Sequence, residues 1–365
     1  MNGIIANPHS LLKETLKQME KGPKENATSS AIEAIQKHAE ALGQKSRFKL
    51  FTAAVAKDVY TSAEKFADFG ISRRKYKYKS AKQVAKASGF AWTYRFENFL
   101  PMKAEKIRKV VSYALENKNL LSVTLESFQK FKLNSHQSYA LILKAANLNG
   151  PLVAQYFPNF GLNSIEEEGI FEIAKAAFLD DPRGSSKYIR HFGLETEKYK
   201  HELLLIRLKD DADKGLALTQ KFGIQTRELR LDAATVCALY DGWVFSSQIQ
   251  EWNFGEEDRL VLAMTSLQSN LVGALRYHAN YKLGRENLFK FFSQAIDLIA
   301  SKKEEMELIE FVKQSINDRE GKYKLALRYA VLDPESFLRE LPKWEFSDED
   351  SSFLRRISLE AGKKA

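Results

Sequence analysis

The chain has 365 residues, of which 44% are hydrophobic and 28% charged, a composition typical of folded globular proteins. Its single cysteine, Cys237, excludes an internal disulfide and any site built from several cysteines, and its low content of Gly and Pro disfavours an all-β fold. No apolar run approaches the length of a membrane span, and the first residues lack the pattern of a secretory signal, so a cytoplasmic location is expected.

The net charge of +9 is unevenly distributed along the chain. Residues 1–150 hold 26 Lys and Arg against 12 Asp and Glu, whereas residues 151–365 hold 30 against 35. The first part is therefore expected to attract a nucleic acid, an anionic membrane surface or an acidic protein. The second part has no such preference.

The predicted organisation starts with a short N-terminal helix followed by a flexible linker, because Gly, Pro, Asn and Ser gather in residues 21–30. Repeated helical units are predicted to follow, and the two ends of the chain differ from them, as terminal caps do. The predicted parts are residues 1–30 as helix and linker, 31–150 as basic repeats, 151–345 as neutral-to-acidic repeats and 346–365 as a C-terminal cap.

A Phe-Gly pair recurs about every 30 residues, a period that is typical of helical-repeat arrays. The clear copies are Phe69-Gly70, Phe160-Gly161, Phe192-Gly193, Phe222-Gly223 and Phe254-Gly255, and degenerate copies fill the gaps. We expect the Phe to be a buried packing anchor. We expect the Gly to end a helix in the left-handed conformation, which glycine adopts without steric cost.

The residues between two Phe-Gly pairs predict two helices. After Gly161, apolar residues follow the spacing of one helical face, and Asn163 or Ser164 is expected to cap the helix start. The run 181–184, which contains Pro182, is expected to break this helix, and a second one follows up to Phe192. The predicted fold is therefore all-α, a superhelical α-solenoid of right-handed type with about ten two-helix repeats.

This two-helix unit is similar to the α-solenoid class, which includes tetratricopeptide, pentatricopeptide and armadillo-type repeats, although it is shorter than the tetratricopeptide unit and lacks its closing Pro. The run 188–194, with the residues Glu172 to Lys175 before it, also resembles uncharacterised repeat proteins of bacteria that live inside amoebae. That resemblance brings no known activity. It implies an alternative function and location, those of an effector secreted into a host cell without a classical signal peptide.

The usual motifs of enzymes are absent from the sequence. Phosphate-binding glycine loops and nucleophile elbows are missing, and Leu205 stands where a zinc protease starting at His201 would place its second His. Cys237 lies in an apolar stretch and is expected to be an inert, buried thiol. We therefore predict a protein that is not an enzyme and has no catalytic residues, no metal site and no cofactor.

A basic and aromatic stretch around residues 73–95 is the main candidate for a binding site. A helix there places Lys75, Lys79, Lys82 and Lys86 on one face, where they can follow a phosphate backbone. The alternative is a solvated helix face with aromatic anchors behind it. The candidate residues for binding nucleic acid or an acidic partner are Arg73, Arg74, Lys75, Tyr76, Lys77, Tyr78, Lys79, Lys82, Lys86, Trp92 and Arg95.

Two of these candidates, Tyr76 and Trp92, carry rings that can stack on a base or pack between helices. Further basic residues follow one repeat on, namely Lys103, Lys106, Arg108 and Lys109. They extend the basic stretch into the next predicted helix.

Three functions are compatible with these patterns. The first is a non-catalytic scaffold for a macromolecular partner, above all a protein or peptide on the concave face of the solenoid. The second is a DNA- or RNA-binding protein that uses at most the first four repeats, because later repeats lack the positive charge. The third is an enzyme with a site dispersed over several repeats, which no motif supports.

Overall fold

The computed structural model describes residues 8–116, 121–302, 312, 314–316 and 319–363. Within these ranges the chain forms helices and no strand, which confirms the predicted all-α class. The chain divides into two compact units, unit 1 (Met1–Glu195) and unit 2 (Thr196–Ala365). None of the helices described has both the length and the apolar character needed to span a bilayer.

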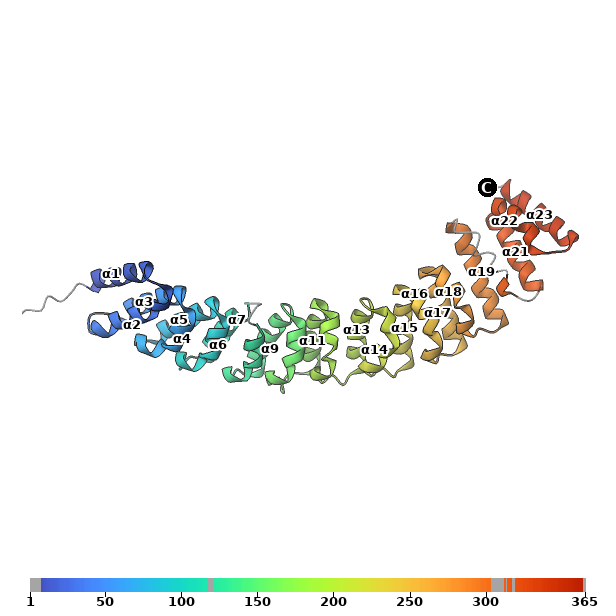
Figure 1. Cartoon of the computed structure of the whole chain (residues 1–365). Helices are drawn as coiled ribbons and strands as arrows, with labels where there is room; N and C mark the ends of the chain where they lie inside the picture. The colour runs from blue at the N-terminus through green and yellow to red at the C-terminus, as the bar shows by residue number, and fades with distance from the viewer. Residues whose placement is uncertain (1–7, 117–120, 303–311, 313, 317–318, 364–365) are drawn as a thin grey trace, which may run out of the picture. The chain divides into compact units, whose positions relative to one another are not determined.

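In unit 1, longer and shorter helices alternate along the chain (Figure 1). The longer ones are α1 (Pro8–Lys21), α3 (Gln44–Lys57), α5 (Arg74–Ala87), α7 (Ala104–Leu115), α9 (Ser135–Ala146) and α11 (Glu167–Asp180). The shorter ones are α2 (Ala27–Lys37), α4 (Val59–Glu64), α6 (Gly89–Tyr94), α8 (Leu121–Glu126), α10 (Gly150–Tyr156) and α12 (Pro182–Ser186). From α3 onward each long helix packs against the next, so these helices lie side by side in chain order.

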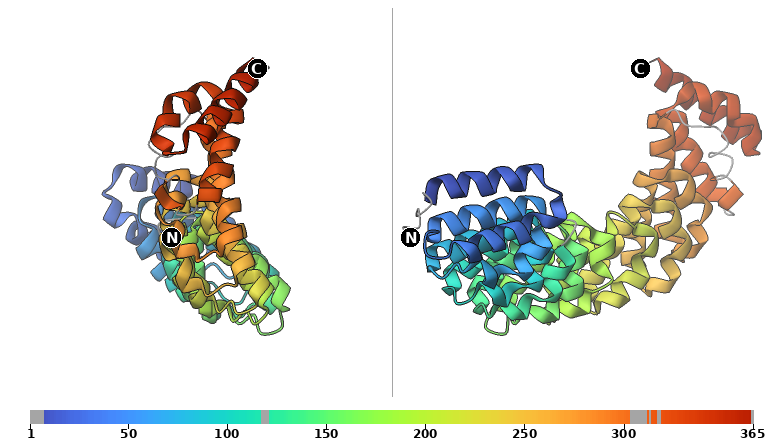
Figure 2. Two further views of the ribbon diagram at one scale, coloured as in Figure 1. Left: turned by 90° about the vertical axis from the view of Figure 1, so that its right-hand side faces the viewer. Right: turned by 60° about the vertical axis from the view of Figure 1, so that its left-hand side comes forward.

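Unit 2 has the same alternation, which can be followed in the yellow to red helices of Figure 2. Its longer helices are α13 (Glu197–Leu208), α15 (Arg227–Tyr240), α17 (Glu256–Ser269), α19 (Arg285–Lys302), α21 (Arg319–Leu332) and α23 (Asp348–Gly362). Its shorter helices are α14 (Gly215–Phe222), α16 (Gly242–Gln248), α18 (Leu271–Arg276) and α22 (Pro334–Glu340). Here, too, successive long helices are in contact.

Most of the short helices continue into a 3₁₀ helix that ends at a ring. These 3₁₀ helices are η2 (Phe66–Phe69), η3 (Phe96–Phe99), η5 (Phe128–Phe131), η6 (Phe157–Phe160), η7 (Ile189–Phe192), η9 (Ile249–Trp252), η10 (His278–Tyr281) and η11 (Leu341–Trp344). The last residue of each is at most 3% exposed. We call this residue, together with the one after it, a joint, and we extend the name to Phe222 and Gly223 at the end of α14, where Phe222 is 3% exposed.

The ring of a joint packs against the ring that starts the preceding 3₁₀ helix. The ring centroids of Phe66 and Phe99 lie 4.4 Å apart, and those of Phe157 and Phe192 lie 4.7 Å apart. Such pairs add to the apolar area that each ring buries. The prediction that the joint Phe is a buried anchor is therefore confirmed.

The residue after the anchor is left-handed at most joints. The predicted glycines Gly70, Gly161, Gly193 and Gly223 have φ between 57° and 70°. The same conformation occurs at joints without glycine, with φ between 47° and 56°, at Lys132, Asn253, Lys282 and Glu345. The left-handed conformation therefore forms at these four positions despite the steric cost that a Cβ atom adds.

The prediction for Phe254-Gly255 is wrong. Gly255 has φ −64° and is the N-cap of α17, so it is not left-handed. The joint there is formed by Trp252 and Asn253, two residues earlier. Phe254 and Gly255 therefore match the sequence of a joint but do not have its structure.

The flexible linker predicted for residues 21–30 is also wrong. The segment contains η1 (Lys24–Asn26) and the first turn of α2. Ala27, Ala31 and Ile32 are buried on one side of α2, and this burial offsets the weak helix propensity of the polar residues between them.

The helix start and the break predicted around residues 162–184 are shifted. α11 begins at Glu167, with Glu166 and not Asn163 or Ser164 as its N-cap. The break is confined to Asp181, whose carboxylate accepts a hydrogen bond from the amide of Gly184. Pro182 then occupies the first turn of α12, where a missing amide hydrogen costs no helical hydrogen bond.

Candidate functional site

The long helices carry related residues at equivalent positions. Counted from the first residue of each helix, the fifth position holds Phe48 in α3, Tyr78 in α5, Arg108 in α7 and Tyr139 in α9. The sixth position holds Lys49, Lys79, Lys109 and Ala140 in the same helices. We call the fifth and sixth positions the groove positions.

The fifth position of one long helix meets the sixth position of the next. In unit 1, the ammonium of Lys79 lies 6.0 Å from the ring centroid of Phe48. In unit 2, His201 Nε2 lies 3.2 Å from Asp232 Oδ2, and Lys324 lies 5.9 Å from the ring centroid of Phe289. This recurrence defines one line of side-chain pairs along each unit.

Lysines of α5 lie over the ring of Tyr113 in α7. The ammonium groups of Lys82 and Lys86 are 4.6 Å and 4.9 Å from the ring centroid of Tyr113. A hydrogen bond between Lys82 and the Tyr113 hydroxyl raises the pKa of the lysine and lowers the pKa of the tyrosine. Lys82 therefore stays charged at neutral pH.

Two tyrosines of α5 also contact the neighbouring long helices. Lys106 of α7 lies 4.6 Å from the ring centroid of Tyr78, and the rings of Tyr76 and Phe48 lie 5.5 Å apart. Cations and rings thus alternate across α3, α5 and α7.

A groove of about 600 Å³ lies between α3 and α5. Its lining residues are Phe48, Val55 and Ala56 from α3, and Lys79, Lys82, Gln83, Lys86 and Ala87 from α5. The groove therefore combines an apolar surface with a row of lysines. Such a combination suits a ligand that has both flat apolar groups and negative charge.

Among the residues that the structure describes, seven lysines of α3, α5 and α7 have neither a carboxylate partner nor a hydrogen bond to a backbone carbonyl. They are Lys45, Lys49, Lys75, Lys79, Lys82, Lys86 and Lys106, and we call this set the basic face. All seven are exposed or half-buried.

The acids of α7 and of its C-cap are engaged with other cations. Glu105 pairs with Arg108 at 3.2 Å and with Lys109 at 3.3 Å, and Glu116 pairs with Lys144 at 2.7 Å. The charge of the basic face is therefore left for a partner to neutralise.

The structure brings several predicted site residues together and separates others from them. Lys75, Lys79, Lys82 and Lys86 share one side of α5, as predicted, while the opposite side is buried. Tyr76 and Tyr78 lie at the contacts with α3 and α7 described above. Arg73 and Arg74 are exposed at the start of α5.

Three predicted site residues make contacts within the protein instead, namely Lys77, Trp92 and Arg95. Lys77 donates a hydrogen bond to the carbonyl of Leu100 at 2.8 Å. The Trp92 side chain is fully buried and stacks on Phe131 at 5.0 Å, so it packs between helices and is excluded from stacking on a base. Arg95 pairs with Glu64 at 2.8 Å, between α6 and α4.

In several long helices the side chain at position one binds the backbone in front of the next long helix, a role that was not predicted from the sequence. Gln44 accepts hydrogen bonds from the amides of Ser72 at 2.8 Å and Arg73 at 3.2 Å. Glu197 accepts from the amide of Thr226 at 2.8 Å, in front of α15. The helices α3, α11, α13 and α17 start with such a side chain, namely Gln44, Glu167, Glu197 and Glu256, and its recurrence at the helix start is the signal that could have found this role.

A basic residue at position four binds the next joint. The guanidinium groups of Arg47, Arg230 and Arg259 donate to carbonyls of following joints, at 3.3 Å to Gly70, 2.6 Å to Trp252 and 2.6 Å to Tyr281. Lys77 has this position in α5, which explains its bond to Leu100. These cations stabilise the repeats and are not part of the basic face.

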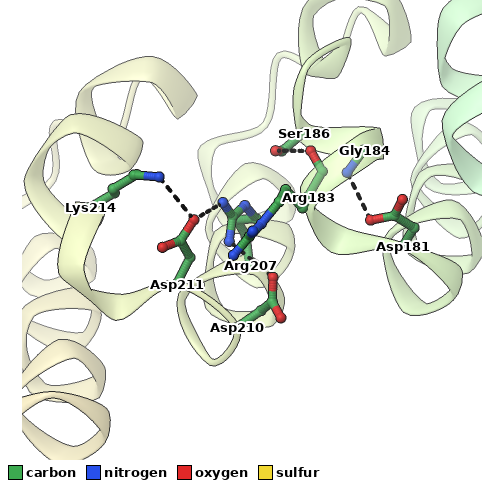
Figure 3. A network of polar contacts seen from close by, with 8 residues as sticks. All are labelled: Asp181, Arg183, Gly184, Ser186, Arg207, Asp210, Asp211 and Lys214. Atoms are coloured by element: carbon green, nitrogen blue, oxygen red, sulfur yellow. Dashed lines mark hydrogen bonds and ion pairs between the residues drawn. The ribbon is translucent and has the colours of Figure 1, made fainter.

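A buried ionic network follows α13 in unit 2 (Figure 3). The Arg207 side chain is only 4% exposed and pairs with Asp210 at 3.3 Å and with Asp211, which Lys214 also reaches. A hydrogen bond between Asp213 and Asp211 lowers the pKa of Asp211 and raises that of Asp213, and Arg207 lowers the pKa of Asp211 further. These acids compensate a buried cation, which is a structural role.

The remaining chemically notable groups of unit 2 are buried. Burial raises the pKa of the Cys237 thiol to about 12, and its side chain is 1% exposed, as predicted for an inert thiol. Burial also lowers the pKa of His201. Within the described ranges, no three His, Cys, Asp or Glu side chains are arranged to hold a metal ion.

No protein-family model matches this chain, and a search of curated proteins gives no significant match.

Proposed function

We propose that the protein is a non-catalytic scaffold of tandem helical repeats, an α-solenoid of about ten two-helix units, that binds an anionic macromolecule on the basic face. The observation that carries this proposal is the set of seven lysines without carboxylate partners, among the described residues, on α3, α5 and α7. The recurring joints support the solenoid part, because stacked helix pairs bury a shared core and leave their long helices exposed on one side.

Electrostatics favour an anionic partner. Like charges on neighbouring helices repel one another, and this repulsion is relieved when a partner brings negative charge. In unit 2 several basic residues of the long helices are instead paired, as in Arg227 with Asp258 at 2.7 Å and Arg319 with Asp350 at 2.6 Å. The proposal therefore places binding on unit 1.

Two classes of partner fit this surface. A protein or peptide with an acidic segment would be held on the face that the long helices present, which is the concave side in the proposed solenoid. A nucleic acid is the second candidate, and the rings between the lysines favour it, because aromatic side chains stack on bases.

The test is binding of labelled probes to the full chain, measured by fluorescence anisotropy between about 50 mM and about 200 mM NaCl. The probes are a single-stranded oligonucleotide, the matching duplex and a poly-glutamate peptide. Replacing Lys79, Lys82 and Lys86 by Glu is expected to weaken binding of the preferred probe at least tenfold. For a single strand, it should reduce the slope of log K against log salt by about 2, because each phosphate contact contributes about 0.7.

A matched control reverses three exposed lysines in or near the 3₁₀ helices, Lys65, Lys130 and Lys187. It changes the net charge by the same amount and should bind as the parent does. Equal losses in both variants would mean that only overall charge matters. If no probe binds to the folded parent at low salt, the proposed function is wrong.

A further inference from the structure

A planar residue followed by a lysine occurs at the groove positions of three successive long helices. The pairs are Phe48-Lys49 in α3, Tyr78-Lys79 in α5 and Arg108-Lys109 in α7, each 30 residues after the one before. General attraction of anions explains the lysines but not the planar residues at a fixed register. The pattern therefore favours a ligand with one flat group and one negative charge per repeat.

The contacts place these residues at the surface between helices. Phe48 is half-buried and lines the groove between α3 and α5, with the Tyr76 ring 5.5 Å away and Lys79 6.0 Å away. Tyr78 is half-buried between α5 and α7, where Lys106 lies 4.6 Å from its ring. The guanidinium of Arg108 is held by two hydrogen bonds to Glu105 and its side chain is 35% exposed.

We propose that unit 1 binds single-stranded nucleic acid with one nucleotide per repeat across α3, α5 and α7. Phe48, Tyr78 and Arg108 are the planes on which successive bases stack. The lysines of the basic face hold the phosphates. Helical-repeat proteins of other kinds read one base per repeat, and bases stack on aromatic rings and on guanidinium planes. This inference rests on the proposed function and names its partner.

The same register explains why the tract ends after three repeats. In α9 the sixth position is Ala140, which has no charge for a phosphate. The hydroxyl of Tyr139 donates a hydrogen bond to Glu172 of α11, and a carboxylate at this position repels phosphate. In α15 the sixth position is again acidic, Asp232. The favoured ligand is therefore a tract of about three nucleotides within a longer single strand.

The rings and the lysines can be tested separately. Phe48→Leu and Tyr78→Leu keep apolar bulk but remove the planes, so each should weaken binding of an oligouridine 9-mer about fivefold or more. The slope of log K against log salt should stay as in the parent, because the phosphate contacts remain. Tyr78→Phe keeps the plane and should bind as the parent does, and Tyr139→Leu, outside the tract, should have no effect.

Photo-crosslinking of the parent chain to an oligonucleotide that carries 5-iodouracil provides a second readout that needs no variant. Adducts mapped by mass spectrometry are expected on Phe48 or Tyr78. Adducts found only elsewhere would overturn the one-base-per-repeat assignment, whatever the stability of the variants.

The outcomes separate this inference from the proposed function. If the three lysine reversals lose binding but both leucine variants bind as the parent does, the stacking assignment is wrong and the proposed function stands. The stacking assignment is equally wrong if a duplex or poly-glutamate binds as tightly as the single strand. If nothing anionic binds at low salt, both are wrong.

Discussion

Two glycines that follow a phenylalanine, Gly223 and Gly255, have opposite backbone conformations. Gly223 closes a joint with φ 70°, whereas Gly255 has φ −64° and starts α17. A Cβ would meet no atom within 4 Å at either position. Any difference between alanine substitutions at the two positions therefore reports backbone conformation and not packing.

We expect Gly223→Ala to lower the free energy of unfolding by about 1–2 kcal/mol, the cost of a left-handed conformation for an L-residue. Gly255→Ala should change it by less than about 0.5 kcal/mol, because the reduced freedom of the unfolded chain offsets the loss of a good N-cap residue. Urea unfolding of both variants, followed by far-UV circular dichroism, measures the difference. Equal effects would contradict the assignment of the joint to Asn253 and not to Gly255.

The anchors were predictable from the sequence because phenylalanine dominates them, but single joints were not. Trp252 and Tyr281 fill the anchor position as well as Phe does, and Lys282 tolerates the left-handed conformation that glycine was expected to supply. The position of a joint therefore depends on the shape and burial of its side chain. Residue identity alone places the joint two residues too late, at Phe254-Gly255.

Within the candidate site, the sequence placed the lysines of α5 correctly and could not place their partners. The spacing from Lys75 to Lys86 follows from helix geometry within one element. The contacts of Lys79 with Phe48 and of Lys82 with Tyr113 join residues about 30 positions apart. Their register depends on where each joint lies, and that is known only once the joints are seen.

At the scale of the element, several long helices are fastened to the next by polar side chains at their first or fourth positions. Glu197 is the clearest case, because its carboxylate accepts hydrogen bonds from the backbone of Gln225 and from both the amide and the hydroxyl of Thr226. The hydrogen bond from the Thr226 hydroxyl, followed by that from its amide, lowers the pKa of Glu197. The negative charge also lies at the start of α13, where the helix dipole favours it.

We expect Glu197→Ala to destabilise the protein by about 1 kcal/mol, the usual loss for a capping side chain. The native state favours the charged carboxylate, so the unfolded state binds more protons around the ordinary pKa of 4.5. The stability from Glu197 is therefore fully present above that pH and is lost as the pH falls through the lowered native value.

Thermal unfolding at pH 7 and at about pH 3.5 measures this effect. The melting temperatures of parent and variant should differ at pH 7 and converge in acid. Lys198→Ala, at the exposed neighbouring residue, is the control and should show no such convergence. A difference that persists unchanged in acid would show that Glu197 acts through packing and not through its charge.

The same scale shows why the helix boundaries were predicted less well than the helices. Pro182 was expected to break a helix, although a proline in the first turn begins a helix as readily as a later proline ends one. Asp58, Asn149 and Asp241 cap short helices in the same way as Asp181 does. This recurring cap is a boundary signal in its own right, and its period matches that of the joints.

At the scale of the whole molecule, the two units differ in how far the basic residues of their long helices are paired with carboxylates. The lysines of the basic face in unit 1 lack carboxylate partners among the described residues, whereas long helices of unit 2 pair Lys324 with Glu320 and Arg328 with Asp297. Unpaired like charges repel over a screening length of about 30 Å at 0.01 M salt and about 3 Å at 1 M. Added salt should therefore stabilise the helices of the basic face in unit 1 and slightly destabilise the ion-paired helices of unit 2.

We expect added NaCl to slow amide hydrogen exchange in α5 and α7, because screening relieves the repulsion between lysines of the basic face. Exchange in α17 and α21 should stay the same or become slightly faster, because the same ions weaken surface ion pairs. Hydrogen exchange of the full chain, resolved by peptide, measures both units in one sample. The Lys79, Lys82 and Lys86→Glu variant removes the source of the effect, so its α5 should lose the response to salt. Equal slowing in α5 and α17 of the parent would instead reveal a general salt effect and would remove the argument that the basic face awaits an anionic partner.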